Sequence, residues 1–400
     1  MLGPGLVIAA QVFGHLPAVF LPAGPMTSGL PNEDKSKVRQ AFAAGEASRA
    51  DLMAAEMAAY HGPGTCTFYG TANTNQMLME LMGLHLPGAS FVNPNTPLRD
   101  ALTTSGAQRS LALSALGDSY LPGCDNLDEK AFVNGIVGLN ATGGSTNLLI
   151  HLIAMARAGG ILLDWQDFSD ISAVTPLVAR VYPNGLADVN AFHAAGGLGA
   201  MIGSLLEAGL LHEDVNTIAG LGLGRYTEEP VLQNHALSWR PGARDSLSDR
   251  ILRPVSSPFQ ATGGLVRLTG NLGTAVTKIL TIAEEHRVVE AEAAVFDSQE
   301  AVKAAFKAGD LSRDVVVVVR FQGPKANGMP ELHTLTPVLK LLQGVVTRLH
   351  WSRMGGCRGP QARSRLRSMS ALRRLMAARL RGCRPAICGA WMQAPAVWKS

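Results

Sequence analysis

Cys66 is the first side chain of this sequence whose setting could support chemistry. It lies in the segment GPGTCTFYG, flanked by Gly62, Gly64 and Gly70. Glycines allow a backbone to approach a bulky group closely and to turn its N–H groups toward it. Thiolate is also the usual ligand of an iron–sulfur cluster. A lone cysteine, however, is more commonly a small apolar core residue. The spacing therefore leaves a cluster ligand and a core residue both open.

A second glycine-rich segment, ATGGSTN at 141–147, places Ser145 and Thr146 directly before an apolar run. The free N–H groups and positive dipole end of a helix N-terminus can bind a phosphate or a carboxylate. The alternative is that one of the two hydroxyls simply caps the helix. Taken alone, capping is the simpler interpretation.

Glu331 is the third candidate, because it follows a Gly-Met-Pro turn in a loop that leaves five consecutive valines, Val315–Val319. A carboxylate at the end of a strand suits a hard cation such as Mg²⁺, although most loop glutamates are only solvated. Three histidines lie singly in apolar helical contexts and are expected in the core or at its rim: His85, His151 and His193. Lys278 and Lys325 have no local partner that distinguishes them.

The composition indicates an α/β fold with a large core. The chain has 400 residues, of which 47% are hydrophobic and 16% charged, with 43 glycines and 22 prolines. Such glycine and proline contents favour many turns over a helical bundle. No apolar run reaches the roughly 18 residues that span a bilayer. The five cysteines lack the paired spacing of a secreted disulfide framework. We therefore expect a cytoplasmic protein.

The elements that must position the candidates follow from the hydrophobic pattern. Leu6–Ala23 predicts two buried strands, and Asn32–Tyr60 predicts one or two helices. Helices are also expected over Thr74–Met82, after Asn147, within Ala187–Asn216 and after a capping box at 297–300. Strands are expected within Pro254–Lys278 and at Val315–Val319.

Charge divides the chain near Gly344. Residues 344–400 hold twelve of the 35 Lys and Arg residues and no Asp or Glu, which leaves 23 basic against 31 acidic side chains before them. The same stretch holds three of the five cysteines: Cys357, Cys383 and Cys388. This change suggests that two compositions of different origin are joined there.

The segment from Gly62 to Thr103, GPGTCTFYGTANTNQMLMELMGLHLPGASFVNPNTPLRDALT, closely resembles the signature of the 6-phosphogluconate dehydratases. These form a branch of the dihydroxy-acid dehydratase superfamily. The resemblance continues through NGIVGLNATGGSTNLLIHL, GGLVRLTGNLGTAVTK and VVRFQGPKANGMPELHTL, and covers about residues 3–343. The TFYGTAN form of the cysteine loop favours the phosphogluconate branch over the dihydroxy-acid branch.

The resemblance implies a fold, a reaction and cofactors. An α/β N-terminal domain would be followed by a smaller β-barrel-like C-terminal domain, usually in a homodimer. The reaction would remove water from 6-phosphogluconate to give 2-keto-3-deoxy-6-phosphogluconate, in the Entner–Doudoroff pathway. Cys66 corresponds to a ligand of an iron–sulfur cluster, expected to be 4Fe–4S, and Glu331 to a possible Mg²⁺ ligand. No nucleic acid or membrane partner is implied.

The family pattern also predicts losses at both ends. The other two cluster cysteines of the family lie in segments that precede the position of Met1, so this chain is expected to lack them and to be inactive as it stands. No catalytic residue is assigned. Cys124 lies in an ordinary turn and is a poor substitute. After Gln343, one inserted base in a chosen set of codons restores a family-like T-D-G-R-M-S-G reading, which predicts a frameshift at Gly344.

We therefore expect three segments. Residues 1–240 would form an incomplete cluster-binding α/β domain, 241–343 a partial β-rich domain, and 344–400 a basic frameshift-like tail. Two other functions stay open. The chain could act on another sugar acid or dihydroxy acid, or it could be a non-catalytic fragment whose basic tail binds nucleic acid or a membrane.

Overall fold

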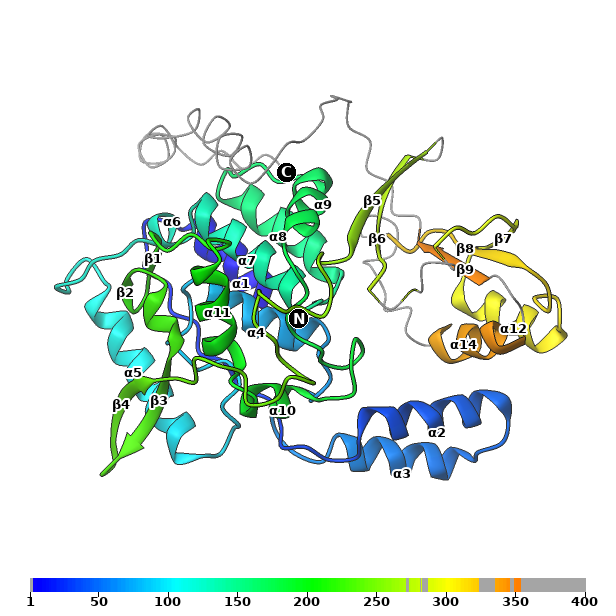
Figure 1. Cartoon of the computed structure of the whole chain (residues 1–400), viewed down its shortest axis with the longest axis horizontal. Helices are drawn as coiled ribbons and strands as arrows, with labels where there is room; N and C mark the ends of the chain where they lie inside the picture. Colours follow the sequence, from blue (N-terminus) through cyan, green and yellow to red (C-terminus); the bar gives the residue numbers. More distant parts are fainter. Residues whose placement is uncertain are drawn as a thin grey trace, which may run out of the picture. The chain divides into compact units, whose positions relative to one another are not determined.

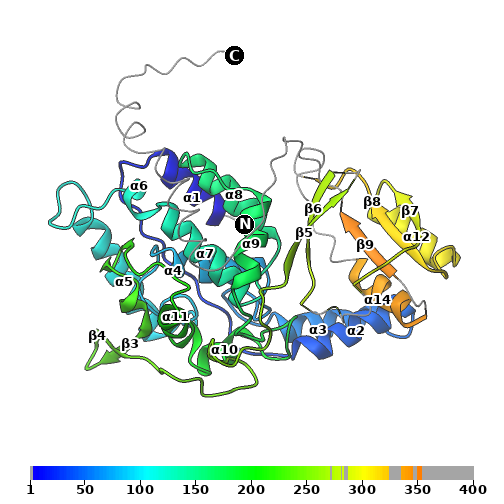
Figure 2. The same ribbon diagram turned by 45° about the horizontal axis from the view of Figure 1, so that its top comes forward.

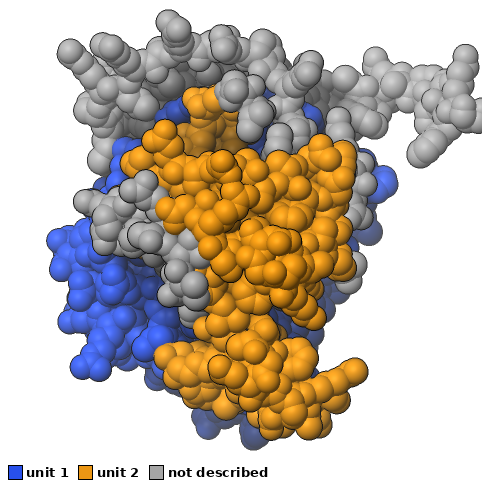
Figure 3. Space-filling view, turned by 90° about the vertical axis from the view of Figure 1, so that its right-hand side faces the viewer, with its two compact units in different colours: residues 1–27, 62–265, 362–400 blue, residues 28–61, 266–361 orange. Residues whose placement is uncertain are grey.

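The structure, a computed structural model, describes residues 3–270, 273–280, 282, 287–323, 335–345 and 349–353. The chain divides into two compact units, which Figure 3 colours separately. Of the described residues, 3–27 and 62–265 belong to unit 1, and 28–61 and those from 266 to 353 belong to unit 2. Candidate residues Glu331 and Lys325 lie outside the described residues. So does the expected tail, except for residues 344–345 and 349–353.

Unit 1 is mainly helical, with α4 and α7 at its centre (Figure 1). Its strands form two short antiparallel hairpins, β1 (Asn216–Thr217) with β2 (Gly220–Leu221) and β3 (Glu228–Gln233) with β4 (Ala236–Pro241). Its helices are α1 (Gly3–Val12), α4 (Thr71–Leu81), α5 (Pro97–Ala112), α6 (Gly123–Asn126), α7 (Glu129–Ala141), α8 (Asn147–Ala158), α9 (Trp165–Val174), α10 (Val189–Ala194), α11 (Gly197–Glu207) and the 3-10 turn η1 (Gly224–Thr227).

Helix α4 packs closely on α7 deep in unit 1, because α7 has a glycine, Gly138, where the two helices meet. Every residue of α4 from Asn73 to Leu81 is buried. A Cβ atom added to Gly138 of α7 would lie 2.1 Å from Leu81 Cδ1. A side chain at that position would therefore overlap the Leu81 side chain and require it or the helix to shift. The close packing holds α4 in place, and its N-terminal end follows the Cys66 loop directly.

The prediction of two strands over Leu6–Ala23 was wrong. Residues 3–12 form α1, which packs on α8 and buries Val7, and no regular strand follows it up to Ala23. Gln11 Nε2 donates a hydrogen bond to Leu127 O at 3.2 Å. A short apolar run fits a strand and a buried helix equally well, and two alanines and a glutamine favour the helix.

The other predicted helices are present. In unit 2, Asn32–Ala44 forms α2 and Arg49–Ala59 forms α3, with a capping box between Ser48 and Asp51 at the start of α3. Helix α12 (Gln299–Ala308) is also present, but Ser298 caps it by accepting from Ala301 N. The N-cap is therefore Ser298 and not the predicted Asp297, and no acidic side chain completes a capping box there.

The sheet of unit 2 is parallel and has the order β7–β8–β9 (Figure 2). Its strands are β7 (Glu292–Phe296), β8 (Val315–Val319) and β9 (Leu349–Arg353), while β5 (Leu265–Gly270) pairs with β6 (Gly273–Lys278). The predicted valine strand is thus confirmed as the central strand. Helix α14 (Thr336–Val345) packs on α2.

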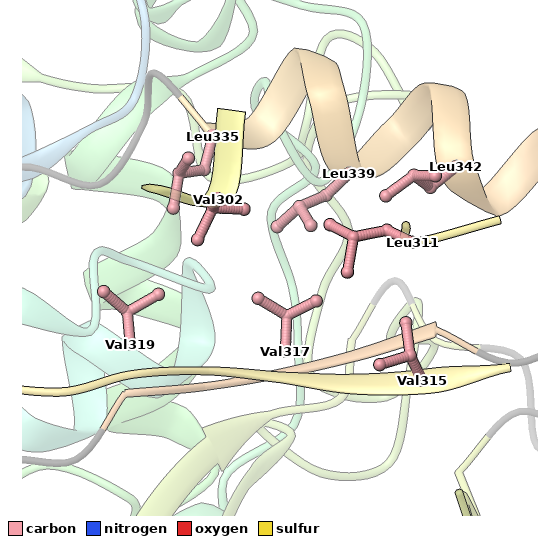
Figure 4. Packing of buried hydrophobic residues seen from close by; sticks show 8 residues of the cluster. All are labelled: Val302, Leu311, Val315, Val317, Val319, Leu335, Leu339 and Leu342. Atoms are coloured by element: carbon pink, nitrogen blue, oxygen red, sulfur yellow. The ribbon is translucent and has the colours of Figure 1, made fainter. Parts of the chain in front are cut away.

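The core of unit 2 explains why five valines form one strand. Val315, Val317 and Val319 are fully buried, whereas the two valines between them are only partly buried. Figure 4 shows the three buried valines directed toward leucines on the helical side. Full burial of such a side chain contributes about 1.5–3 kcal/mol. The cluster consists of Val302, Leu311, Val315, Val317, Val319, Leu335, Leu339 and Leu342.

The expected β-barrel-like arrangement is not found among the described residues. Their strands form a two-stranded and a three-stranded sheet in the C-terminal part, and neither closes on itself. The described residues therefore form a mixed α/β structure, as predicted, in which no barrel is seen. No helix in the described part of the chain is long and apolar enough to cross a membrane.

Candidate functional site

The loop that carries Cys66 is held along one side by residues 24–26. Thr65 N donates to Gly24 O at 2.9 Å, and Met26 N donates to Thr65 O at 2.8 Å. Gly64 has φ +112°, and a Cβ atom there would lie 2.7 Å from Met26 N. Gly64 is therefore required both for its backbone conformation and for this close approach. In the sequence, Gly64 suggested room for a ligand, but in the structure it allows the loop to pack closely on the backbone of Met26.

The other side of the loop lies against residues 182–189. Val189 N donates to Thr67 O, and Tyr69 N donates to Tyr182 O, each at 3.1 Å. The rings of Phe68 and Tyr182 meet edge to face with centroids 5.5 Å apart. Cys66 is half-buried and not in a disulfide, and its Sγ lies 3.8 Å from Phe68 O. The structure thus presents a half-buried cysteine thiol on a loop fixed on both sides.

The two glycine-rich motifs meet at the N-terminal ends of α4 and α8. Thr71 Oγ1 lies 3.1 Å from Ser145 Oγ and accepts a hydrogen bond from Asn147 Nδ2 at 3.0 Å. Ser145 N donates to Thr74 Oγ1 at 3.1 Å. Nothing in the sequence joined these motifs, because they lie more than seventy positions apart.

The capping alternative for the second motif holds in part. Thr146 is the N-cap residue of α8, but its side chain makes no capping hydrogen bond. Instead, Ser145 Oγ accepts from Asn147 N at 3.4 Å. The hydroxyl that caps the helix is therefore also the one that contacts Thr71 of the Cys66 motif. An anion-binding role for this end of α8 stays a prediction.

A buried carboxylate lies farther along α4, and the sequence reasoning missed it. Glu80 is fully buried and accepts hydrogen bonds from Gly88 N and Ser90 N, each at 2.9 Å. Burial raises the pKa of Glu80 despite these bonds. Burial also lowers the pKa of Arg99 to about 10, against the opposing charge of Glu80. The available signal was a glutamate inside the otherwise apolar run MLMELMGL.

His85 belongs to the same buried region and confirms the prediction that it is a core residue. Its Nδ1 lies 2.8 Å from Ser90 Oγ, and its carbonyl oxygen accepts from Tyr226 Oη at 2.9 Å. Burial lowers its pKa to about 3. His85 is therefore neutral at physiological pH and holds the turn that follows α4. His151 is partly buried, and His193 lies at the surface of unit 1.

A cavity of about 250 Å³ opens in unit 1, away from the Cys66 loop. Its lining includes Glu80, Phe91, His193 and Thr227, but no residue of the two glycine-rich motifs.

In unit 2, burial lowers the pKa of Lys278 to about 8. No feature of the sequence distinguished Lys278 from other lysines.

The described residues hold one candidate thiolate ligand, Cys66, and not a full set for a cluster. Among them, no group of three or more His, Cys, Asp or Glu side chains could hold a metal ion. Cys124 belongs to α6, where its amide donates to Gly14 O at 2.9 Å. None of the hydrogen bonds given above connects Cys124 to the Cys66 loop. An iron–sulfur cluster needs several thiolates, so these residues alone do not fit one.

Comparison with known proteins shows the class of the chain. The model of the dihydroxy-acid/6-phosphogluconate dehydratase N-terminal region matches residues 2–226, and that of the C-terminal region matches residues 250–360. These matches cover well over half of the chain, so the chain belongs to the dihydroxy-acid/6-phosphogluconate dehydratase family.

Similarity is greater to the phosphogluconate branch, which confirms the resemblance inferred from the cysteine loop. The chain is 59% identical to the phosphogluconate dehydratase of Rhizobium meliloti over 360 residues, which cover 89% of this chain and 59% of the relative. Identity to the Pseudomonas aeruginosa phosphogluconate dehydratase is 59% over 340 residues, with coverages of 85% and 56%. The dihydroxy-acid dehydratase of Thermus thermophilus is 34% identical over 298 residues, which cover 74% of this chain and 51% of the relative. The chain thus spans a little over half the length of these relatives.

Proposed function

We propose that this chain is part of a hydro-lyase that removes water from 6-phosphogluconate and releases 2-keto-3-deoxy-6-phosphogluconate. The proposal concerns the complete enzyme, because the relatives extend beyond the matched residues. The observation that carries it is the difference in identity between the relatives named phosphogluconate dehydratase, at 59%, and the one named dihydroxy-acid dehydratase, at 34%. A homodimeric, cytoplasmic enzyme is part of the same proposal.

Within that enzyme we assign Cys66 as one ligand of an iron–sulfur cluster, of the 4Fe–4S type, and Glu331 as a Mg²⁺ ligand. The thiol of the half-buried Cys66, which is not in a disulfide, and the fixed backbone on both sides of it support the first assignment. Glu331 lies outside the described residues. One thiolate does not retain a cluster. We therefore expect this polypeptide alone to acquire no cluster absorbance after anaerobic treatment with iron and sulfide.

A chimera tests the substrate. Residues 1–343 would replace the matching region of the Pseudomonas aeruginosa relative, so that every missing segment comes from a protein named phosphogluconate dehydratase. We expect the chimera to form its 2-keto product from 6-phosphogluconate and to act poorly on unphosphorylated gluconate. The substitution Cys66→Ser in the chimera should abolish turnover, whereas Cys124→Ser, as the matched control, should leave it unchanged.

Turnover of gluconate at a rate equal to or above that of 6-phosphogluconate would instead support a different sugar-acid dehydratase. Full activity of the Cys66→Ser chimera would overturn the ligand assignment.

A further inference from the structure

Asn73, the third residue of α4, is completely buried beneath the Cys66 loop. Its Nδ2 donates to Cys66 O at 2.5 Å and to Phe68 O at 2.7 Å. Its Oδ1 accepts from Thr65 Oγ1 at 2.8 Å and from Gln76 Nε2 at 2.9 Å. An asparagine amide offers two N–H donors and two acceptor lone pairs. Asn73 therefore uses its full hydrogen-bonding capacity, and three of its four partners belong to the loop.

The orientation of the Asn73 amide follows from these partners. Carbonyl oxygens only accept, so the nitrogen must face Cys66 O and Phe68 O, and the oxygen must face the two donors. Gln76 extends the network, because its Nε2 also donates to Thr65 Oγ1 at 3.1 Å and its Oε1 accepts from Gly24 N at 3.0 Å. Neither aspartate nor an apolar residue can make this set of bonds.

We infer that Asn73 is a positioning residue for Cys66. It binds the carbonyl of Cys66 itself and that of the second residue after it, and so determines how the rigid helix α4 presents the thiol. The positioning itself stands on these contacts. Only its meaning for the reaction, as the control of a cluster ligand, rests on the proposed function.

The substitution Asn73→Asp tests the inference without changing the size of the side chain. Whichever way the carboxyl group is oriented, at least one former N–H donor is replaced by an oxygen that faces a carbonyl oxygen, which is unfavourable when buried. The loop should then open locally more often and expose the thiol. In the full chain, kept free of metal, we expect iodoacetamide to alkylate Cys66 at least about fivefold faster than in the wild type. Mass spectrometry of peptides resolves each cysteine, and Cys124 serves as the internal reference, with a rate changed less than about twofold.

Asn134→Asp is the matched control. Asn134 is also fully buried, on α7, and exchanges two hydrogen bonds with the backbone of His212 at 2.9 and 2.8 Å. Its substitution perturbs another loop of unit 1 and should leave Cys66 alkylation unchanged. Thr65→Val removes one donor to Asn73 and provides a milder test if Asn73→Asp does not fold. It should accelerate alkylation of Cys66 to a smaller extent.

Equal acceleration in the Asn73→Asp and Asn134→Asp proteins would overturn the inference, because it would show general loosening of unit 1. An unchanged Cys66 rate in Asn73→Asp, or in Thr65→Val if only that variant folds, would overturn it as well. The chimera separates the two ideas. An inactive chimera with selective acceleration refutes the proposed function alone, and an active chimera without acceleration refutes the positioning role alone.

Discussion

At the scale of single residues, the buried side chains of His85 and Glu80 make the stability of unit 1 depend on pH. His85 has a pKa of about 3 because of burial, whereas an unfolded histidine titrates near 6.5. As the pH falls below 6.5, His85 becomes protonated in the unfolded chain but stays neutral in the folded protein. The contribution of His85 is therefore fully present above pH 6.5 and is lost as the pH falls toward 3.

The variant His85→Asn removes this dependence while keeping a polar group near Ser90 Oγ, which lies 2.8 Å from His85 Nδ1. Between pH 7 and pH 5 the free energy of unfolding should fall by roughly 2 kcal/mol less in the variant than in the wild type. Urea unfolding at the two pH values, followed by circular dichroism, measures the difference. His235→Asn is the control, because His235 is exposed and has φ +64°, which asparagine tolerates.

Glu80 acts in the opposite direction. Since burial raises its pKa, its contribution to stability is present below about pH 4.5 and is lost as the pH rises through the folded-state pKa. Wild type and His85→Asn share this effect, so their difference isolates histidine. An equal pH dependence in the two proteins would contradict the assignment to His85.

At the scale of elements, α4 connects the Cys66 loop to the core, and its contact with α7 can be tested by a double-mutant cycle. Leu81→Ala should lower the free energy of unfolding by about 2–5 kcal/mol, since Leu81 is fully buried. Gly138→Ala should cost about 1–3 kcal/mol, because the added methyl group would overlap Leu81 Cδ1.

The double variant should be more stable than the sum of the two losses predicts, because alanine at 81 leaves room for the methyl group at 138. Urea unfolding of all four proteins gives the coupling energy. Additive losses, within about 0.5 kcal/mol, would show that the two side chains do not share this space.

How far the elements could be predicted depended on how local their causes are. The strand Val315–Val319 follows from β-branched side chains, and the helices within Asn32–Tyr60 follow from residue types at helical spacing. Both are features of neighbouring residues. Helix α1 was mistaken for a strand because a short apolar run fits both elements, and its burial against α8 depends on tertiary packing. The same reason hid the contact between Thr71 and Ser145 and the anchoring of Cys66 by Asn73. The sequence identified the thiol, and the fold supplied its partners.

At the scale of the whole molecule, the division of charge predicts what residues 344–400 do. They carry twelve basic and no acidic side chains, whereas residues 1–343 carry an excess of eight acidic ones. The predicted frameshift would account for this composition without any function. If it is correct, sequencing the DNA around the Gly344 codon should reveal an out-of-frame reading of G-R-M-S-G. The absence of that reading would remove the explanation.

Nucleic-acid binding separates the frameshift hypothesis from a functional basic tail. The full chain would be compared with a chain that ends at Gln343, using a fluorescent oligonucleotide at 50 and 200 mM salt. Attraction to phosphates through lysine and arginine alone releases counterions, so any affinity of the full chain should fall on the order of 10³-fold between the two salt concentrations. The shortened chain, with its acidic excess, should not bind at either concentration. Tight, saturable binding of the full chain that persists at 200 mM salt would require contacts beyond charge, which a stretch translated out of frame has no reason to possess.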